Sequence, residues 1–181
     1  MNDDVWLRRQ ASAWLDQHSF SDPWVVILGL GAGYHVEAFG ARFPESRITV
    51  LDVNEAAVND ASQGRRFPSD LVECHHIMDE QFAGTDLCRR IFEEMPPILC
   101  FQPAFGENQQ KFDRIFRLLT GRSREGLETF FSVMGVDVKL SEEIAGGRHL
   151  LTMKDLGFVI DQGGLGLPSV SAVRVLRELL V

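Results

Sequence analysis

The chain has 181 residues, a length that suits one ordinary domain with a sizeable core. Hydrophobic residues make up 45% of it and charged residues 24%, which is the balance of a soluble globular protein. The net charge of −8 argues against nucleic acid as a partner, because phosphate binding needs clustered Lys and Arg side chains. No apolar run approaches the roughly 18 residues of a membrane span, and the first residues lack the basic-then-apolar order of a signal peptide. A cytoplasmic protein with no membrane partner is expected.

The first 20 residues predict a helix. Its apolar face is spaced four, three, one and three residues apart, at Leu7, Ala11, Trp14, Leu15 and His18. Asp3 or Asp4 can serve as the N-cap of this helix.

From residue 24 to 121, buried-type apolar runs alternate with segments of helical spacing. Strands are expected at 24–29, 47–52, 71–77 and 97–101. Four helices are expected between and after these strands. The first ends at Pro44 and the second begins at Asn54. The third covers 85–95 before Pro96, and the fourth includes Phe112 to Leu119 before Gly121. This alternation predicts an α/β fold, a Rossmann-like three-layer sandwich with a mainly parallel sheet.

The pattern weakens after Gly121, although the whole chain, 1–181, is expected to form a single domain around the core at 24–121. Residues 123–135 are predicted to be helical, 157–161 to form a fifth strand and 169–181 to form a closing helix. A turn-rich loop is expected between the last two, at 163–168.

Three glycines follow the first expected strand at intervals of two: Gly29, Gly31 and Gly33. Ligands of parallel sheets collect beyond the carboxyl ends of the strands, and glycines there let a ligand approach the backbone at a helix N-terminus. Tyr34 replaces the third glycine of the dinucleotide fingerprint, which makes NAD a less favoured ligand. The alternative interpretation is that the glycines only let strand and helix pack closely.

Asp52 ends the second expected strand, 19 residues after Gly33. An acidic side chain at about 20 residues binds a ribose diol in such folds, because a carboxylate can accept from two vicinal hydroxyls. Asn54 follows as a helix cap and as a further candidate at the site. Asp52 also fits the plainer role of an ordinary strand exit. We therefore predict a small-molecule ligand at Gly29, Gly31, Gly33, Tyr34, Asp52 and Asn54.

Other polar residues are less favoured candidates for ligand or metal contacts. Tyr34 and His35 stand at the mouth of the glycine turn, where a packing role competes with ligand contact. Cys74, His75 and His76 point to alternate faces of a strand and cannot easily meet one metal ion, so no metal site is expected. With Cys88 and Cys100, Cys74 makes an odd number of widely spaced cysteines, which favours reduced thiols over disulfides.

Two resemblances emerge, a shorter one over the first two expected strands and a second one over residues 25 to about 130. "ILGLGAGYHVEAFGARFPESRITVLDVNEAAV" resembles the first two strands of class I S-adenosylmethionine methyltransferases. That resemblance implies a GxGxG loop under the methionine end and a second-strand acid, here Asp52, on the ribose. "GLGAGYH", "VLDVNE" and "CFQPAFG" resemble the N-terminal domain of motility accessory factors, bacterial proteins associated with flagellin glycosylation. That resemblance implies a ligand-binding module that need not catalyse a reaction.

The sequence departs from each pattern at a definite place. Ile27 stands where the methyltransferases usually carry an acid, and the chain is too short for the larger sugar-transfer domain of the motility family. The leading hypothesis is a module that binds S-adenosylmethionine or another adenosine-type nucleotide. The alternative is a small-molecule methyltransferase in which the loop after Phe101 meets the acceptor, by positioning donor and acceptor rather than by acid-base chemistry.

Overall fold

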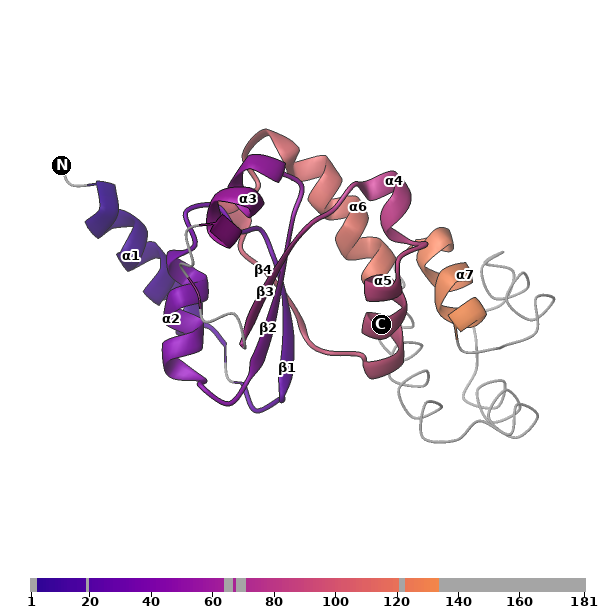
Figure 1. The fold of residues 1–181 in the computed structure, drawn as a ribbon, viewed down its shortest axis with the longest axis horizontal. Helices are drawn as coiled ribbons and strands as arrows, with labels where there is room; N and C mark the ends of the chain where they lie inside the picture. Colours follow the sequence, from indigo (N-terminus) through magenta and orange to yellow (C-terminus); the bar gives the residue numbers. More distant parts are fainter. Residues whose placement is uncertain (1–2, 19, 64–66, 68–70, 121–122, 134–181) are drawn as a thin grey trace. The chain divides into compact units, whose positions relative to one another are not determined.

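The structure, a computed structural model, describes residues 3–18, 20–63, 67, 71–120 and 123–133 (Figure 1). The chain divides into two compact units, one of Met1–Asp79 and Pro96–Asp113, the other of Glu80–Met95 and Arg114–Val181. The strand expected at 157–161, the loop at 163–168 and the helix at 169–181 lie outside the described residues. The expectation of a single domain likewise stays a prediction.

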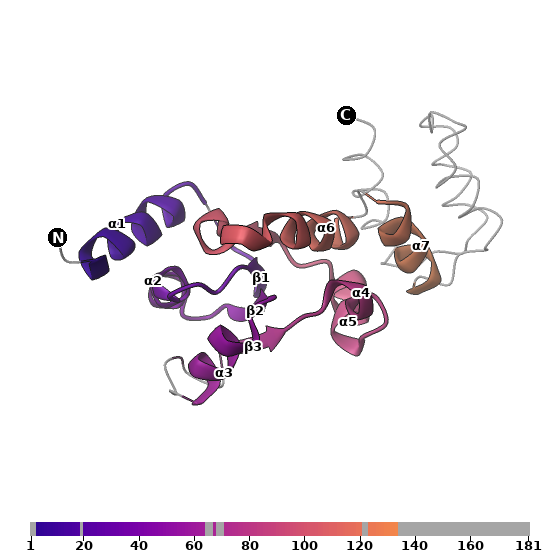
Figure 2. The same ribbon diagram turned by 90° about the horizontal axis from the view of Figure 1, so that it is seen from above.

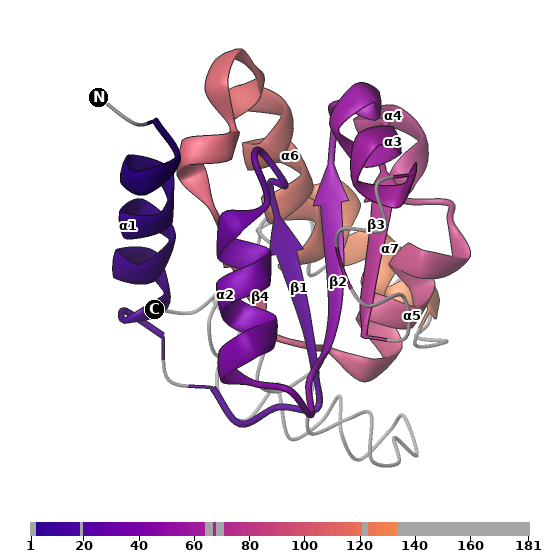
Figure 3. The ribbon, with the colours of Figure 1, turned by 60° about the vertical axis from the view of Figure 1, so that its left-hand side comes forward.

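The first unit contains a four-stranded, all-parallel sheet in the order β3-β2-β1-β4 (Figure 3). Its strands are β1 (Trp24–Leu28), β2 (Arg47–Asp52), β3 (Val72–His76) and β4 (Ile98–Cys100). β1 pairs with β2 from Trp24 opposite Arg47 to Leu28 opposite Leu51. All five residues of β1 are buried, as expected for a central strand of a parallel sheet. The predicted α/β, Rossmann-like fold class is confirmed.

Three helices lie against one face of this sheet: α1 (Asp3–Leu15), α2 (Tyr34–Arg42) and α3 (Glu55–Gln63) (Figure 2). Strand side chains alternate between faces, so every second residue of β1 and β2 points toward these helices. The resulting core joins helix and sheet residues: Trp14, Leu15, Val25, Ile27, Leu30, Val36, Phe39, Ile48, Val50, Val58, Val72 and Phe101. This packing fixes the carboxyl end of β1 relative to α2 and α3.

Helix α1 also protects the free side of β4. The amide of Phe101 donates to the Leu28 carbonyl on β1, so the preceding carbonyl, that of Cys100, points away from β1. The indole Nε1–H of Trp14 donates to this Cys100 carbonyl at 2.9 Å. An acceptor at the edge of the described sheet is thereby satisfied by a side chain rather than by another strand.

The chain after β4 differs from expectation. No helix is predicted between Phe101 and Phe112, yet two 3-10 turns form there, η1 (Gln102–Ala104) and η2 (Gly106–Asn108). Pro103 favours the first turn because its fixed φ is compatible with a helix start. The expected helix then begins somewhat earlier, as α6 (Gln109–Leu119).

The described part of the second unit is helical. It holds α5 (Asp86–Glu94) and α7 (Arg124–Val133), which contact each other, and most of the short α4 (Asp79–Phe82). Thr85, the first residue of the expected range 85–95, caps α5 by accepting from the Cys88 amide at 3.1 Å. Met95, with φ 48°, ends α5 before Pro96. The prediction of a helix within 123–135 is confirmed by α7.

Candidate functional site

The turn between β1 and α2 requires glycine at three positions. Gly29, Gly31 and Gly33 have φ values of 94°, 48° and 75°, all in the left-handed region that other residues rarely adopt. The Gly33 amide donates to the Leu30 carbonyl at 2.8 Å, which closes the turn, and α2 begins at Tyr34. The glycines recur at every second position because the backbone has a positive φ at each of these positions, and this holds whether or not a ligand binds.

One side of this glycine turn is covered by the chain itself. A Cβ added to Gly29 would lie 3.0 Å from both the Ala104 Cβ and the Phe105 ring, and one on Gly31 would lie 3.0 Å from the Ala104 Cβ. The segment after β4 therefore packs directly on these two glycines. Close packing, the alternative interpretation from the sequence, accounts for Gly29 on this side.

Asp52 holds the glycine turn in place. Its Oδ2 accepts from the Leu30 amide at 2.6 Å and its Oδ1 from the Asn54 amide at 2.7 Å. The side chain comes from the end of β2 and the residue is only 2% exposed. Contact with a ribose, the predicted role of Asp52, would have to use the second lone pairs of two oxygens that already accept hydrogen bonds.

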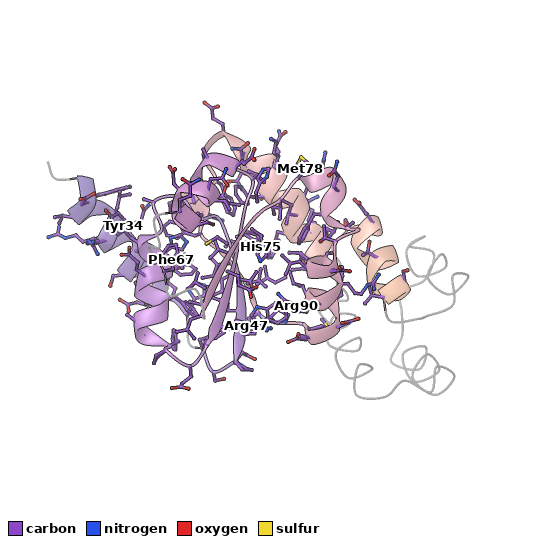
Figure 4. All side chains as sticks on the ribbon, in the orientation of Figure 1. Tyr34, Arg47, Phe67, His75, Met78 and Arg90 are labelled. Atoms are coloured by element: carbon purple, nitrogen blue, oxygen red, sulfur yellow. The ribbon has the colours of Figure 1, made fainter. Side chains whose placement is uncertain are left out.

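The other predicted site residues have contacts within the protein. The Asn54 Oδ1 accepts from the Ala57 amide at 3.3 Å, so Asn54 caps α3 as its sequence position predicts. The Tyr34 hydroxyl donates to Asp4 Oδ1 at 2.9 Å, and the Arg8 guanidinium lies 4.5 Å from the Tyr34 ring centroid. Tyr34 thus joins α2 to α1, beside which it is drawn in Figure 4. Ligand binding by these residues stays a prediction.

His35 has a structural position beneath the turn. Its Nε2–H donates to the Gly29 carbonyl at 2.9 Å, and its ring stacks on Phe101 with centroids 3.7 Å apart. The Trp14 ring lies edge-on to both the His35 and Phe101 rings, with centroids 5.5 Å apart in each pair. Because His35 is buried, its imidazole supports the turn from inside.

An open cleft of about 240 Å³ lies where the glycine turn faces α3; we call it the α3 cleft. Among the described residues, its lining is mostly apolar with one carboxylate, and comprises Leu30, Gly31, Gly33, Ala57, Asp60, Ala61 and Phe67. Gly31 and Gly33 are the two predicted site residues that the structure brings to this cleft. Its volume is somewhat below the roughly 300–1,000 Å³ of sites for drug-sized ligands, which suits a small ligand or part of a larger one.

A second cleft, of about 330 Å³, lies on the other side of the turn tip, against α1; we call it the α1 cleft. In the part of the chain that the structure describes, its lining contains no Asp, Glu, Lys or Arg and comprises Trp6, Leu7, Gln10, Gly31, Ala32, Tyr34, His35, Phe101, Pro103 and Ala104. Gly31 belongs to both clefts. Gly31 and Ala32 are exposed, and their amides have no acceptor in the part of the chain that the structure describes.

Sequence reasoning missed the side chains of α3 and α1 that line these clefts. Ala57, Asp60 and Ala61 share one face of α3 because they are spaced three and four residues apart. The same rule puts Trp6 and Gln10 on one face of α1. Helical periodicity could have placed each set on a common face, but it could not have told which face borders the glycine turn.

The described residues around the glycine turn offer neither a metal site nor a reactive thiol. Among the described residues, no three His, Cys, Asp or Glu side chains are grouped closely enough to hold a metal ion. Burial, together with the smaller effect of the negative charges of Asp52 and Asp113, respectively, raises the pKa of the Cys74 and Cys100 thiols to about 11. Both thiols are therefore protonated and weakly nucleophilic at neutral pH.

Comparison with known proteins gives no assignment. No protein-family model matches the sequence, and no curated protein matches it. Within the described residues, no helix has both the length and the apolar character needed to cross a membrane.

Proposed function

We propose that this chain is a Rossmann-like module that binds an adenosine-type nucleotide or nucleoside in the α3 cleft. The observation that carries the proposal is the position of this cleft. It lies at the carboxyl end of β1, between a turn of three left-handed glycines and α3. That is where parallel α/β sheets bind their ligands.

The chemistry of the α3 cleft suits such a ligand. The side chains of Leu30, Ala57, Ala61 and Phe67 offer apolar contact to a planar base. The exposed Asp60 carboxylate can accept from two vicinal ribose hydroxyls, the role that the sequence suggested for Asp52. Asp52 would then act indirectly, by fixing Leu30 and the turn through its two hydrogen bonds.

We propose further that this module is related to the N-terminal domain of motility accessory factors, which its sequence resembles. The resemblance rests on the turn "GLGAGYH", in which Tyr34 and His35 follow the last glycine. Their bonds to Asp4 and to the Gly29 carbonyl give a physical reason for this pair at the start of α2. Genes for flagellar proteins or sugar nucleotides beside the gene for this chain would support the assignment, and a biosynthetic cluster would count against it.

Methyl transfer is the less supported function. The resemblance to methyltransferases implies a methionine group above the glycine turn, but Ala104 and Phe105 already pack on Gly29. Ile27, at the position of the missing acid, is fully buried in the sheet and offers no charge to an ammonium group. A charged contact of that kind contributes about 1.5–3 kcal/mol, or roughly ten- to a hundredfold in affinity.

Calorimetry with adenosine, S-adenosylmethionine and S-adenosylhomocysteine tests the proposal. Ala57→Leu should fill the α3 cleft and abolish adenosine binding. Ala56→Leu is the control: it adds the same side chain at an exposed neighbouring residue outside the lining, and it should leave adenosine binding unchanged. The two S-adenosyl compounds should bind no more tightly than adenosine. Tight binding of S-adenosylmethionine with adenosine excluded would favour the methyltransferase. Adenosine binding that survives Ala57→Leu would show that the site is elsewhere.

A further inference from the structure

The α1 cleft is built from three separate segments of one unit. Trp6, Leu7 and Gln10 come from α1, Ala32 comes from the glycine turn, and the loop after β4 closes the far wall with Pro103 and Ala104. Its volume of about 330 Å³ falls within the range of small-molecule sites.

The floor of the α1 cleft is fixed before any ligand arrives. His35 stacks on Phe101 and is bonded to the Gly29 carbonyl, while Trp14 packs edge-on against both rings. Tyr34 ties the start of α2 to α1 through Asp4. Because these side chains are already held in place, the floor of the cleft loses little conformational entropy when a ligand binds.

No Asp, Glu, Lys or Arg side chain lines this cleft among the described residues. The side-chain amide of Gln10 and the exposed backbone amides of Gly31 and Ala32 offer hydrogen bonds without bringing a charge to the lining. Trp6, which is 58% exposed, presents a large apolar ring at the same cleft. The α3 cleft differs, because it contains the Asp60 carboxylate.

From this geometry we propose that the α1 cleft is a second binding site, which takes an uncharged, planar aromatic ligand with a hydrogen-bond acceptor. The ring lies against Trp6, and the acceptor meets an amide donor from Gln10 or the turn tip. Aromatic rings favour such stacked or edge-on contacts, and a neutral ligand leaves no buried charge without a partner. The proposal does not depend on nucleoside binding in the α3 cleft.

A pair of probes with the same ring tests the proposal. 4-Nitrobenzyl alcohol is neutral, and 4-nitrobenzoate carries a negative charge on the same nitrophenyl group. In ¹⁵N NMR spectra the chain gives three indole signals, from Trp6, Trp14 and Trp24, and Trp6→Phe identifies the first. The neutral probe should shift the Trp6 signal saturably and leave that of Trp24, at the opposite end of β1, in place. The anion should bind more weakly.

Two variants of α1 supply the matched comparison. Trp6→Ala removes the stacking surface and should weaken binding of 4-nitrobenzyl alcohol about three- to tenfold, as measured by the shifts of the Gly31 and Ala32 amides. Val5→Ala alters the neighbouring exposed residue, 47% exposed and outside the lining, and should leave the affinity unchanged. Both positions are exposed, so both variants should fold. Equal affinity in the two variants, a non-saturating shift, or tighter binding of 4-nitrobenzoate would overturn the proposal.

Discussion

Replacement of Asp52 by Asn tests the assignment of Asp52 as the residue that holds the glycine turn. Both carboxylate oxygens accept from backbone amides, at 2.6 Å from Leu30 and 2.7 Å from Asn54, in a residue that is 2% exposed. Asn keeps one acceptor but turns an NH₂ group toward the other amide. Hydrogen bonds to charged groups contribute about 1.5–3 kcal/mol each, and a buried amide left without an acceptor costs about 1–3 kcal/mol. We therefore expect Asp52→Asn to lower the free energy of unfolding by about 2–4 kcal/mol.

Urea denaturation followed by circular dichroism measures this change. Asp60→Asn is the matched control, because Asp60 is an exposed carboxylate in the α3 cleft, and its stability effect should stay within about 0.5 kcal/mol. The same control should weaken adenosine binding, since it removes the proposed ribose acceptor. An Asp52→Asn variant as stable as the wild type would refute the reasoning, because the two bonds could not then be holding the turn.

Three further predictions concern Gly31, Trp14 and the three cysteines. Gly31→Ala should lower the free energy of unfolding by at least about 1 kcal/mol in urea denaturation, because φ is 48° and the new Cβ would lie 3.0 Å from that of Ala104. Trp14→Phe should cost about 1 kcal/mol in the same assay, through loss of the bond to the Cys100 carbonyl. Cys74, Cys88 and Cys100 are free, and their pKa values are raised by burial to about 11, 12 and 11, so the thiolate fraction stays small below those values. Ellman's reagent should therefore react slowly at pH 8 with native protein, and rapidly with three thiols after denaturation without reductant.

Much of the fold could be predicted because local signals and packing agree. The glycines after β1, the Asn54 and Thr85 caps and the breaks at Pro44 and Pro96 are short-range features that a sequence displays directly. The parallel pairing of β1 and β2 follows from their apolar runs and the helix between them.

The site was harder to predict because its roles are set by contacts between distant residues. Asp52 lies at the distance typical of a ribose-binding acid, but its hydrogen bond to the Leu30 amide depends on how β1 and β2 end side by side. The packing of Ala104 on Gly31 depends on a 3-10 turn about seventy residues later in the chain. Small residues such as Ala57 and Ala61 carry no chemical signature, although they leave the space of the α3 cleft.

The most direct test of nucleoside binding in the α3 cleft is a map of ¹⁵N amide shifts during titration with adenosine. The largest saturable shifts should occur at Gly31, Gly33, Ala57 and Asp60, the cleft residues of the turn and of α3. The amides of Trp24 and Arg47, where β1 and β2 begin at the opposite end of the sheet, should not move. Saturable shifts confined to residues outside the α3 cleft, or no saturable shift up to millimolar adenosine, would contradict the proposed function.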